Sequence, residues 1–431
     1  MFGRFVGPVG TSSDQLISIV YSAPQETTMK KAISISLLLN AVVLAQPIVI
    51  KTTTILDGKG GVLRNKEIVI EGSKISRVAN ARGKATLDLS GLTVMPGWID
   101  THVHPGWYFN RENRLEQGGL GSSETPASAA LYGEANVYAT LMGGFTTVQS
   151  LGQEIDKDLR DLINRGVLPG PRIITSLRSV NENTGNPEKI RAYVDKMKAD
   201  GADVIKLFAT ASIRDGGKQT MTDEQVQAAC SEATKLGLRS VVHAHAPGGA
   251  RAAVLAGCTS VEHGAFLDDA TLQLMADHGT YFDPNFLVLH NYLENKPKFL
   301  GIGNYNEEGF AYMEKGIPMM ADVLKRARAH HLKIVLGTDA VAGSHGRNAE
   351  EFIYRVRDGG QPAMEAIVSG TSLAAESLRL GAKIGSIADG MEADLVAVAG
   401  SPLDDITAVR NVVFVMKGGK VFKNTTHAAQ K

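Results

Sequence analysis

The chain has 431 residues, 43% hydrophobic and 21% charged, which is typical of a soluble globular protein with room for one α/β barrel or two ordinary domains. Its formal net charge is +0, so the composition argues against nucleic acid or an anionic membrane surface as a partner. Cys230 and Cys258 are its only cysteines, too few to staple a chain of this length, so a large core must hold the fold. The sequence leaves open whether these two cysteines pair or stay as buried thiols.

The first 45 residues are expected to precede the mature domain. Met29-Lys30-Lys31 is followed by a mostly apolar run over 32–44, and Val43 and Ala45 occupy the small-residue positions of a cleavage site. This pattern is typical of a bacterial secretory signal peptide over 29–45, with a buried strand or helix as the alternative. Residues 1–28 are interpreted as a non-native or mis-started extension. The mature protein would then be periplasmic or secreted, with no membrane anchor after signal removal.

Short strands and turns are predicted at both ends of the remaining chain. Residues 66–78 form two β-rich arms around Glu71-Gly72-Ser73, which indicates a hairpin. Residues 393–400 and 411–423 have the same character, with a turn at Lys417-Gly418-Gly419. We therefore expect a small composite β-sandwich built from residues 46–96 and 384–424.

The middle of the chain, residues 97–383, alternates apolar runs with helical segments. Helices are predicted over 128–142, 157–166, 187–200 and 222–236, the last opened by a capping-box pattern from Thr222 to Gln225. The strand-like runs are 97–104, 145–148, 172–175, 204–210, 240–245, 260–263, 281–286 and 333–339. Regular βα alternation implies parallel strands, and eight repeats predict an α/β fold with a (β/α)8 TIM-like barrel.

Side chains that can bind metals stand at the carboxyl ends of these runs. His102 and His104 are two apart, so on a strand both imidazoles share one face. His243 and His245 repeat this spacing, His263 ends the next run, and Asp339 ends the last. Each residue alone is more often structural. A barrel brings all these ends to one mouth, so together they predict a metal site there.

Lys206 lies in the apolar run V-I-K-L-F, where burial lowers the pKa of an amine. A neutral amine can react with carbon dioxide and form a carbamate, whose oxygens can bridge two divalent cations. The alternative is a lysine paired with a carboxylate inside the barrel.

Several segments between residues 48 and 424 carry a recognisable pattern: M-P-G-W-I-D-T-H-V-H (95–104), G-F-T-T-V (144–148), G-P-R-I (170–173), V-I-K-L (204–207), H-A-H-A (243–246), S-V-E-H-G (260–264), L-G-T-D-A (336–340), G-S-I-A-D-G-M-E-A-D-L-V (385–396) and F-V-M-K-G-G-K-V (414–421). On these segments the chain resembles the amidohydrolase superfamily. It is most similar to the branch of imidazolonepropionase-like proteins, Xaa-Pro dipeptidase-like and Xaa-Arg/Lys carboxypeptidase-like enzymes, and ochratoxin-hydrolysing amidases.

The resemblance implies a role for each matching residue, around two divalent metal ions of which zinc is the usual one. His102 and His104 would bind the more buried ion, and His243 and His263 the second. A carboxylated Lys206 would bridge the two ions. Asp339 would ligate the buried ion, act as general base and pass a proton to the leaving group. His245, also assigned to the catalytic group, would contact the substrate beside the metals, with the substrate's carboxylate as a candidate contact.

Residues at the mouth of the barrel would set specificity. His345 and Tyr108 are proposed as substrate contacts, and Trp107, Arg178, Asn285 and His290 are weaker candidates. Residues 291–304 are interpreted as a lid. In one respect the chain departs from the peptidase-like pattern, because the loop after the third run, 175–186, carries no histidine.

The sequence therefore predicts a metal-dependent amidohydrolase that cleaves a non-lactam amide bond of a dipeptide or N-acyl amino acid. The alternatives are a hydrolase of a cyclic amide, imidazolone or lactone, a non-catalytic binding protein on the same fold, and a barrel lyase or isomerase. The expected partners are a small-molecule amide or dipeptide substrate and further copies of the chain in a homo-oligomer.

Overall fold

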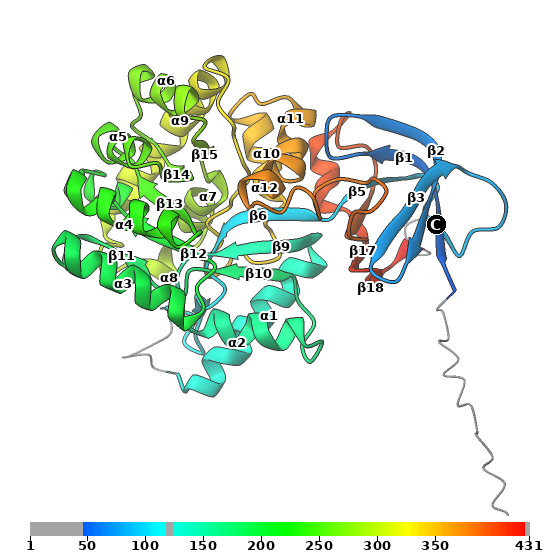
Figure 1. The fold of residues 1–431 in the computed structure, drawn as a ribbon, viewed down its shortest axis with the longest axis horizontal. Coiled ribbons are helices and arrows are strands. Elements are labelled where there is room, and N and C mark those ends of the chain that lie inside the picture. Colours follow the sequence, from blue (N-terminus) through cyan, green and yellow to red (C-terminus); the bar gives the residue numbers. More distant parts are fainter. Residues whose placement is uncertain (1–45, 118–123, 427–431) are drawn as a thin grey trace, which may run out of the picture. The chain divides into compact units, whose positions relative to one another are not determined.

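The computed structural model describes residues 46–117 and 124–426 (Figure 1). The segments interpreted as an extension and a signal peptide, residues 1–28 and 29–45, lie outside the described residues. Among the residues that are described, no helix combines the length and the apolar character that crossing a membrane requires.

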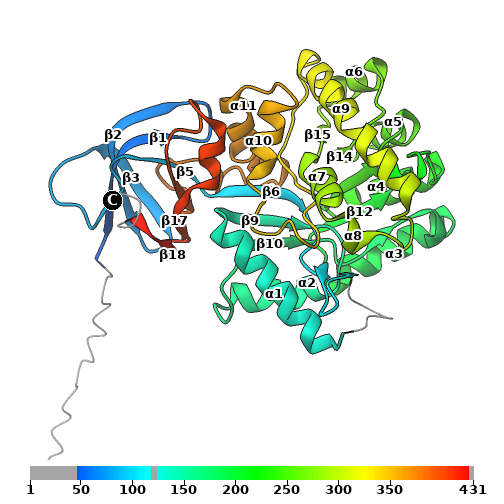
Figure 2. The ribbon, with the colours of Figure 1, turned by 180° about the vertical axis from the view of Figure 1, so that it is seen from behind.

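Strands from both ends of the described chain belong to one sheet of eight strands. The strand order is β18-β17-β16-β5-β1-β2-β3, with β4 paired to β1. In Figures 1 and 2 the blue and the red strands accordingly lie together. The strands are β1 (Ile48–Leu56), β2 (Val62–Glu71), β3 (Lys74–Asn80), β4 (Leu87–Asp88), β5 (Leu92–Pro96), β16 (Leu395–Ala399), β17 (Val412–Lys417) and β18 (Lys420–Asn424). The hairpins predicted around Gly72 and Gly418 are confirmed as the antiparallel pairs β2–β3 and β17–β18.

Parallel strands form two further sheets, β10-β9-β6 and β11-β12-β13-β14-β15. Their bounds are β6 (Trp98–Val103), β9 (Phe145–Ser150), β10 (Arg172–Thr175), β11 (Ser179–Val180), β12 (Val204–Phe208), β13 (Arg239–Ala244), β14 (Ser260–His263) and β15 (Tyr281–Asp283). A small antiparallel pair, β7 (Tyr108–Phe109) and β8 (Leu115–Glu116), follows β6. The chain is thus an α/β protein. The predicted site histidines His102, His104, His243, His245 and His263 lie at or just after the C-terminal ends of parallel strands, and Lys206 lies within β12.

The prediction of an eighth regular strand over residues 333–339 is wrong. The segment and the residue that follows it make only isolated bridges, from Ile334 to β15 and from Ala340 to β6. The physical reason is that the amides of Gly337 and Thr338 donate to the carboxylates of Asp283 and Asp100, at 2.7 and 3.0 Å, instead of joining a ladder. The seventh run is likewise shorter than predicted, because Phe286 already begins a helix.

Helices connect the parallel strands, and α3 to α6 lie outside β12, β14 and β15 in both views (Figures 1 and 2). The helices are α1 (Pro126–Met142), α2 (Ile155–Asn164), α3 (Pro187–Asp200), α4 (Asp223–Lys235), α5 (Pro247–Leu255), α6 (Asp269–His278), α7 (Phe286–Glu294), α8 (Lys296–Phe299), α9 (Glu307–Ala329), α10 (Glu350–Arg357), α11 (Ala363–Ser369) and α12 (Ser372–Ser377). Short 3-10 turns are η1 (Glu182–Thr184), η2 (Ile213–Asp215) and η3 (Ile406–Arg410). The predicted capping box is confirmed: Thr222 accepts from the amide of Gln225, whose side chain accepts from the amide of Thr222.

Cys230 and Cys258 form a disulfide that joins α4 to the short segment just before β14. Both cysteines are buried in the largest hydrophobic cluster, which also contains Ile205, Val242 and Val261 from neighbouring strands. The disulfide therefore ties α4 to the segment that leads into β14, the strand that ends at His263.

Candidate functional site

One cavity of about 130 Å³ gathers the seven side chains that the sequence singled out as a metal and catalytic group. They come from five separated segments of the chain: His102 and His104, Lys206, His243 and His245, His263, and Asp339 all line it. The structure therefore brings the residues together, while their individual roles as ligands stay predictions.

Asp339 faces the pair of histidines at the end of β6. Its Oδ1 lies 3.0 Å from Nε2 of His104 and 3.4 Å from Nε2 of His102. Asp339 has φ +51°, in the left-handed region that side chains other than glycine seldom adopt. Neighbouring bonds hold this conformation: the Thr338 hydroxyl donates to Asp100 at 2.7 Å and accepts from the amide of Ala340.

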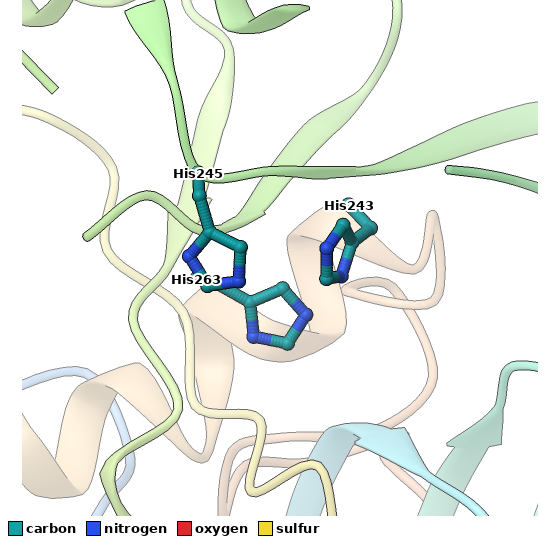
Figure 3. Close-up of side chains that lie close together, drawn as sticks. All are labelled: His243, His245 and His263. Atoms are coloured by element: carbon teal, nitrogen blue, oxygen red, sulfur yellow. The ribbon is translucent and has the colours of Figure 1, made fainter. Parts of the chain in front are cut away.

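A second group of histidines lies on β14 and at the end of β13. Ligand atoms of His243, His245 and His263 all lie within 4.8 Å of one another (Figure 3). Nε2 of His243 lies 3.3 Å from the carbonyl oxygen of Ala211, so this nitrogen carries the proton and Nδ1 is left as an acceptor. Nδ1 of His245 is buried with no hydrogen-bond partner in the described chain.

His263 belongs to both groups, because its ligand atom also lies within 4.8 Å of those of His102 and Asp339. Burial lowers the pKa of His102, His243 and His263 well below the ordinary value, and lowers the pKa of His245 to about 3. These imidazoles are therefore neutral near pH 7, which is the form that binds metal ions. The donor set of neutral imidazoles and one carboxylate suits divalent transition metals.

Lys206 is fully buried on β12. Its Nζ lies 3.4 Å from Nε2 of His102, and no carboxylate forms an ion pair with it in the described chain. Burial lowers the pKa of Lys206. The carboxylates of Glu262, Asp339 and Asp283 act on the amine from beyond ion-pair distance.

A network of buried carboxyl groups, together with one buried arginine, extends from the His102 side chain. Glu262 accepts from Nδ1 of His102 at 3.0 Å and from the Ser260 hydroxyl at 2.6 Å. Burial raises the pKa of both Glu262 and Asp283, and the Glu262 charge raises that of Asp283 further. Arg355, also fully buried, donates to Asp283 at 3.0 Å and so offsets part of the negative charge.

Sequence reasoning missed these supporting residues. Alternation along a strand would put Glu262 and His263 on opposite faces. His263 has φ +71°, however, and this turn lets both residues face the site. The sequence does contain a signal for this network. Three of the predicted strand runs each contain an acidic residue among apolar neighbours, namely Asp100, Glu262 and Asp283.

The outer wall of the cavity is mainly apolar. It is formed by Trp107, Phe208, Ile213, Val288, Leu289 and Met320. Arg214, Tyr292 and Asn285 add polar groups. Of these, Trp107 and Asn285 were among the weaker candidates, whereas Arg214 and Tyr292 were not identified as single residues.

The other predicted substrate-contact residues are not among the residues that line this cavity. Tyr108 stacks on Tyr132 with ring centroids 4.1 Å apart. Nε2 of His345 lies 3.2 Å from the carbonyl oxygen of His104, so His345 contacts the backbone of a predicted ligand. Arg178 forms ion pairs with Glu154 and Asp200.

Two further predictions concern the segment around α7 and α8. His290 stacks on Tyr354 with ring centroids 3.8 Å apart, and it does not belong to the described cavity lining. The segment 291–304, interpreted as a lid, contains the end of α7 and all of α8, and contributes Tyr292 to the cavity.

The chain is similar to several known proteins. The model of the amidohydrolase family matches residues 93–422. Among curated proteins, the chain is 26% identical to the ochratoxinase of Aspergillus niger, over 88% of this chain and 87% of that one. It is 24% identical to an imidazolonepropionase of Caldanaerobacter subterraneus subsp. tengcongensis, over 79% of this chain and 86% of that one.

Among solved structures, a Xaa-Pro dipeptidase with methionine bound in its active site is 32% identical, with a TM-score of 0.79. The alignment covers 88% of this chain and all of that one. With a family model that spans most of the chain and a relative of this similarity, the chain belongs to the amidohydrolase family.

Proposed function

We propose that the protein is a metal-dependent amidohydrolase that hydrolyses the amide bond of a dipeptide or an N-acyl amino acid. The observation that carries this proposal is the convergence of five histidines, Lys206 and Asp339 on one cavity. A binding protein that had lost its chemistry would not need this complete set of side chains.

Two divalent ions, with zinc as the expected metal, would occupy the two groups of side chains. His102, His104 and Asp339 would hold one ion, and His243 and His263 the other. A carbamate on Lys206 would supply oxygen ligands to both. This assignment is supported by the buried, unpaired state of Lys206 and by the short distances among the ligand atoms.

When bound, such ions polarise a carbonyl and lower the pKa of water from about 15.7 to about 7. In the reaction, a water oxygen bonds to the carbonyl carbon, the C–N bond breaks, and the nitrogen leaves as an amine with one added proton. Asp339, partly exposed to the cavity, would accept the proton from water and deliver it to that nitrogen. His245 would contact the substrate through its unpartnered Nδ1.

The choice of an amino-acid derivative rests on the relatives. The solved Xaa-Pro dipeptidase holds methionine in its active site, and the ochratoxinase matches over most of its length. The cavity of about 130 Å³ with a mainly apolar wall suits a compact substrate.

The remaining features of the proposal concern architecture and location. The parallel strands and the segment 333–340, which hydrogen-bonds to both β15 and β6, would form a closed (β/α)8 barrel beside a sandwich from the chain ends. The Cys230–Cys258 disulfide supports an oxidising location, periplasmic or secreted. An oligomer of identical copies is the expected assembly, which light scattering would measure.

The proposal is tested by metal analysis together with a substrate screen. We expect about two transition-metal ions per chain, and turnover of N-acyl amino acids or dipeptides that stops when the ions are chelated. Turnover of imidazolones, other cyclic amides or lactones alone would favour the second class of hydrolase. A metal-loaded protein with no hydrolytic activity in either set would contradict the proposal.

A further inference from the structure

Arg214 is a charged side chain in the wall of the cavity, and it forms no ion pair in the part of the chain that the structure describes. It belongs to η2, the turn that follows β12, and lines the same cavity as the metal-binding side chains. In the described chain, Arg214 forms no ion pair with an aspartate or glutamate. Guanidinium groups stay charged at all ordinary pH values, and the carboxylate that acts on this charge, that of Asp339, itself belongs to the predicted metal-binding group.

The guanidinium is held in place by groups that leave its charge uncompensated. Its Cζ lies 4.0 Å from the ring centroid of Tyr305 and 5.4 Å from that of Tyr292. Its Nε donates to Oδ1 of Asn304 at 2.9 Å, and Asn304 in turn donates to Asp215 at 2.6 Å. Aromatic faces and an amide oxygen orient the planar group without neutralising it.

The turn that carries Arg214 is packed closely against α9. A Cβ atom added at Gly316 would lie 2.6 Å from Cδ1 of Ile213, and one at Gly309 would lie 3.2 Å from Cβ of Arg214. The two glycines are seven residues apart, so they share one face of the helix. Gly217, at the end of the same loop, leaves similar room for His245, at 2.7 Å from its Cβ. Glycine thus permits the close approach that sets Arg214 beside the cavity.

The surroundings define what this arginine could bind. The wall near it consists largely of apolar side chains such as Ile213, Leu289 and Met320. A cation in such a wall favours a ligand that brings one negative group next to an apolar body. Arginine offers two parallel N–H donors that match a carboxylate.

We propose that Arg214 binds the free α-carboxylate of the amino acid whose nitrogen is released, and so restricts the substrate to amides of an apolar amino acid with a free carboxyl end. This inference rests on the proposed function and names its substrate class.

The test compares matched substrates that differ only at the carboxylate. N-acetyl-leucine and N-acetyl-leucinamide are offered to the holoenzyme, and kcat/KM is measured for the acetyl–nitrogen bond of each. We expect the free acid to be preferred by about 10²–10³-fold. In Arg214→Met this ratio should fall toward unity, and in Arg214→Lys it should be intermediate, because lysine keeps the charge but loses the paired donors.

Arg357→Met serves as the matched control. Arg357 also lies over a tyrosine ring, that of Tyr354 at 5.5 Å, but it is exposed on α10 and outside the cavity lining. Its substrate ratio should equal that of the wild type. Calorimetry of leucine against leucinamide binding to each holoenzyme gives a second readout, in which only Arg214→Met should lose the preference for the carboxylate.

The outcomes separate this inference from the proposed function. A wild type that hydrolyses amides but treats acid and carboxamide alike overturns the role of Arg214 and leaves the hydrolase intact. The same holds if Arg214→Met folds, binds metal and keeps the full ratio, or if a carboxylate on the acyl side is the preferred group. A wild type without any amidase activity contradicts the proposed function itself.

Discussion

The Nδ1 atom of His102 lies 3.0 Å from Oε2 of Glu262, and both side chains are buried. This contact fixes the imidazole so that Nε2 faces Asp339 and Lys206. Carboxylates that accept from the second nitrogen of a histidine orient the ring and make it a better metal ligand.

We therefore expect Glu262→Gln to weaken metal binding by about 10–100-fold. The amide can still accept from Nδ1 but lacks the negative charge. Metal affinity would be measured by competition with a chelator of known strength. Glu232→Gln is the control, since Glu232 is also buried but pairs with Lys235 on α4. Equal affinity in the two variants would mean that Glu262 does not act through His102.

Asp339→Asn is expected to lower kcat by about 10²–10⁴-fold, the usual contribution of a positioned general base. The amide cannot take the proton from water, while the fold should persist. Circular dichroism and metal content would be recorded beside kcat. Asp322→Asn, on the exposed side of α9, should keep the wild-type rate. Undiminished turnover in Asp339→Asn would reject its role as base.

Lys206 gives a prediction about carbon dioxide. If a carbamate bridges the metals, metal-free protein should regain activity on addition of zinc only when bicarbonate is present. Lys206→Met should bind less metal and gain nothing from bicarbonate. The metal-free form of this variant should be no less stable than wild type, because an apolar side chain replaces a fully buried amine. Full reconstitution without bicarbonate would contradict the carbamate.

The parts of the fold that sequence alone could predict are those with a strong local period. The helix at 187–200 has the predicted bounds, and those at 126–142, 155–164 and 223–235 differ from prediction by at most two residues at either end. The clustering of the strand-end histidines could also be predicted, because His102 and His104 are two residues apart on one strand and parallel strands end on one side.

What could not be predicted depends on contacts between distant residues. The pattern of residues 333–339 predicts a strand, but the backbone amides of Gly337 and Thr338 donate hydrogen bonds to carboxylates from elsewhere in the chain. Arg214 lies in a loop without periodicity, and its place in the cavity depends on two glycines of α9 about a hundred residues later. Nothing in local sequence encodes such an approach.

Arg355 gives a prediction about stability, because its side chain is fully buried between two carboxylates. It donates to Glu351 at 2.7 Å and to Asp283 at 3.0 Å. Arg355→Met should lower the free energy of unfolding by about 3–5 kcal/mol, since it leaves buried charges without their partner. Arg357→Met on the same helix is exposed and should change stability by less than about 0.5 kcal/mol.

The pH dependence of this loss follows from Asp283. Burial already raises the pKa of this carboxyl in the folded state, and loss of the cation raises it further. A raised folded pKa means that the folded state keeps a proton that the unfolded state releases, so stability falls as pH rises above the unfolded pKa. The difference between Arg355→Met and wild type should thus be larger at pH 8 than at pH 5, as measured by urea unfolding. A difference that does not change between pH 5 and pH 8 would contradict this titration of Asp283.

The disulfide between Cys230 and Cys258 closes a loop with a sequence separation of 28 residues. In the chain-entropy account, a loop of this size stabilises the fold by about 3–4 kcal/mol. The double variant Cys230→Ala and Cys258→Ala should lose about this much, and wild type under reducing conditions should lose a similar amount. Because the bond lies beneath β14 and not in the cavity, metal content and kcat of the folded variant should stay near wild type. If reduction leaves the urea midpoint unchanged, the bond does not contribute to stability.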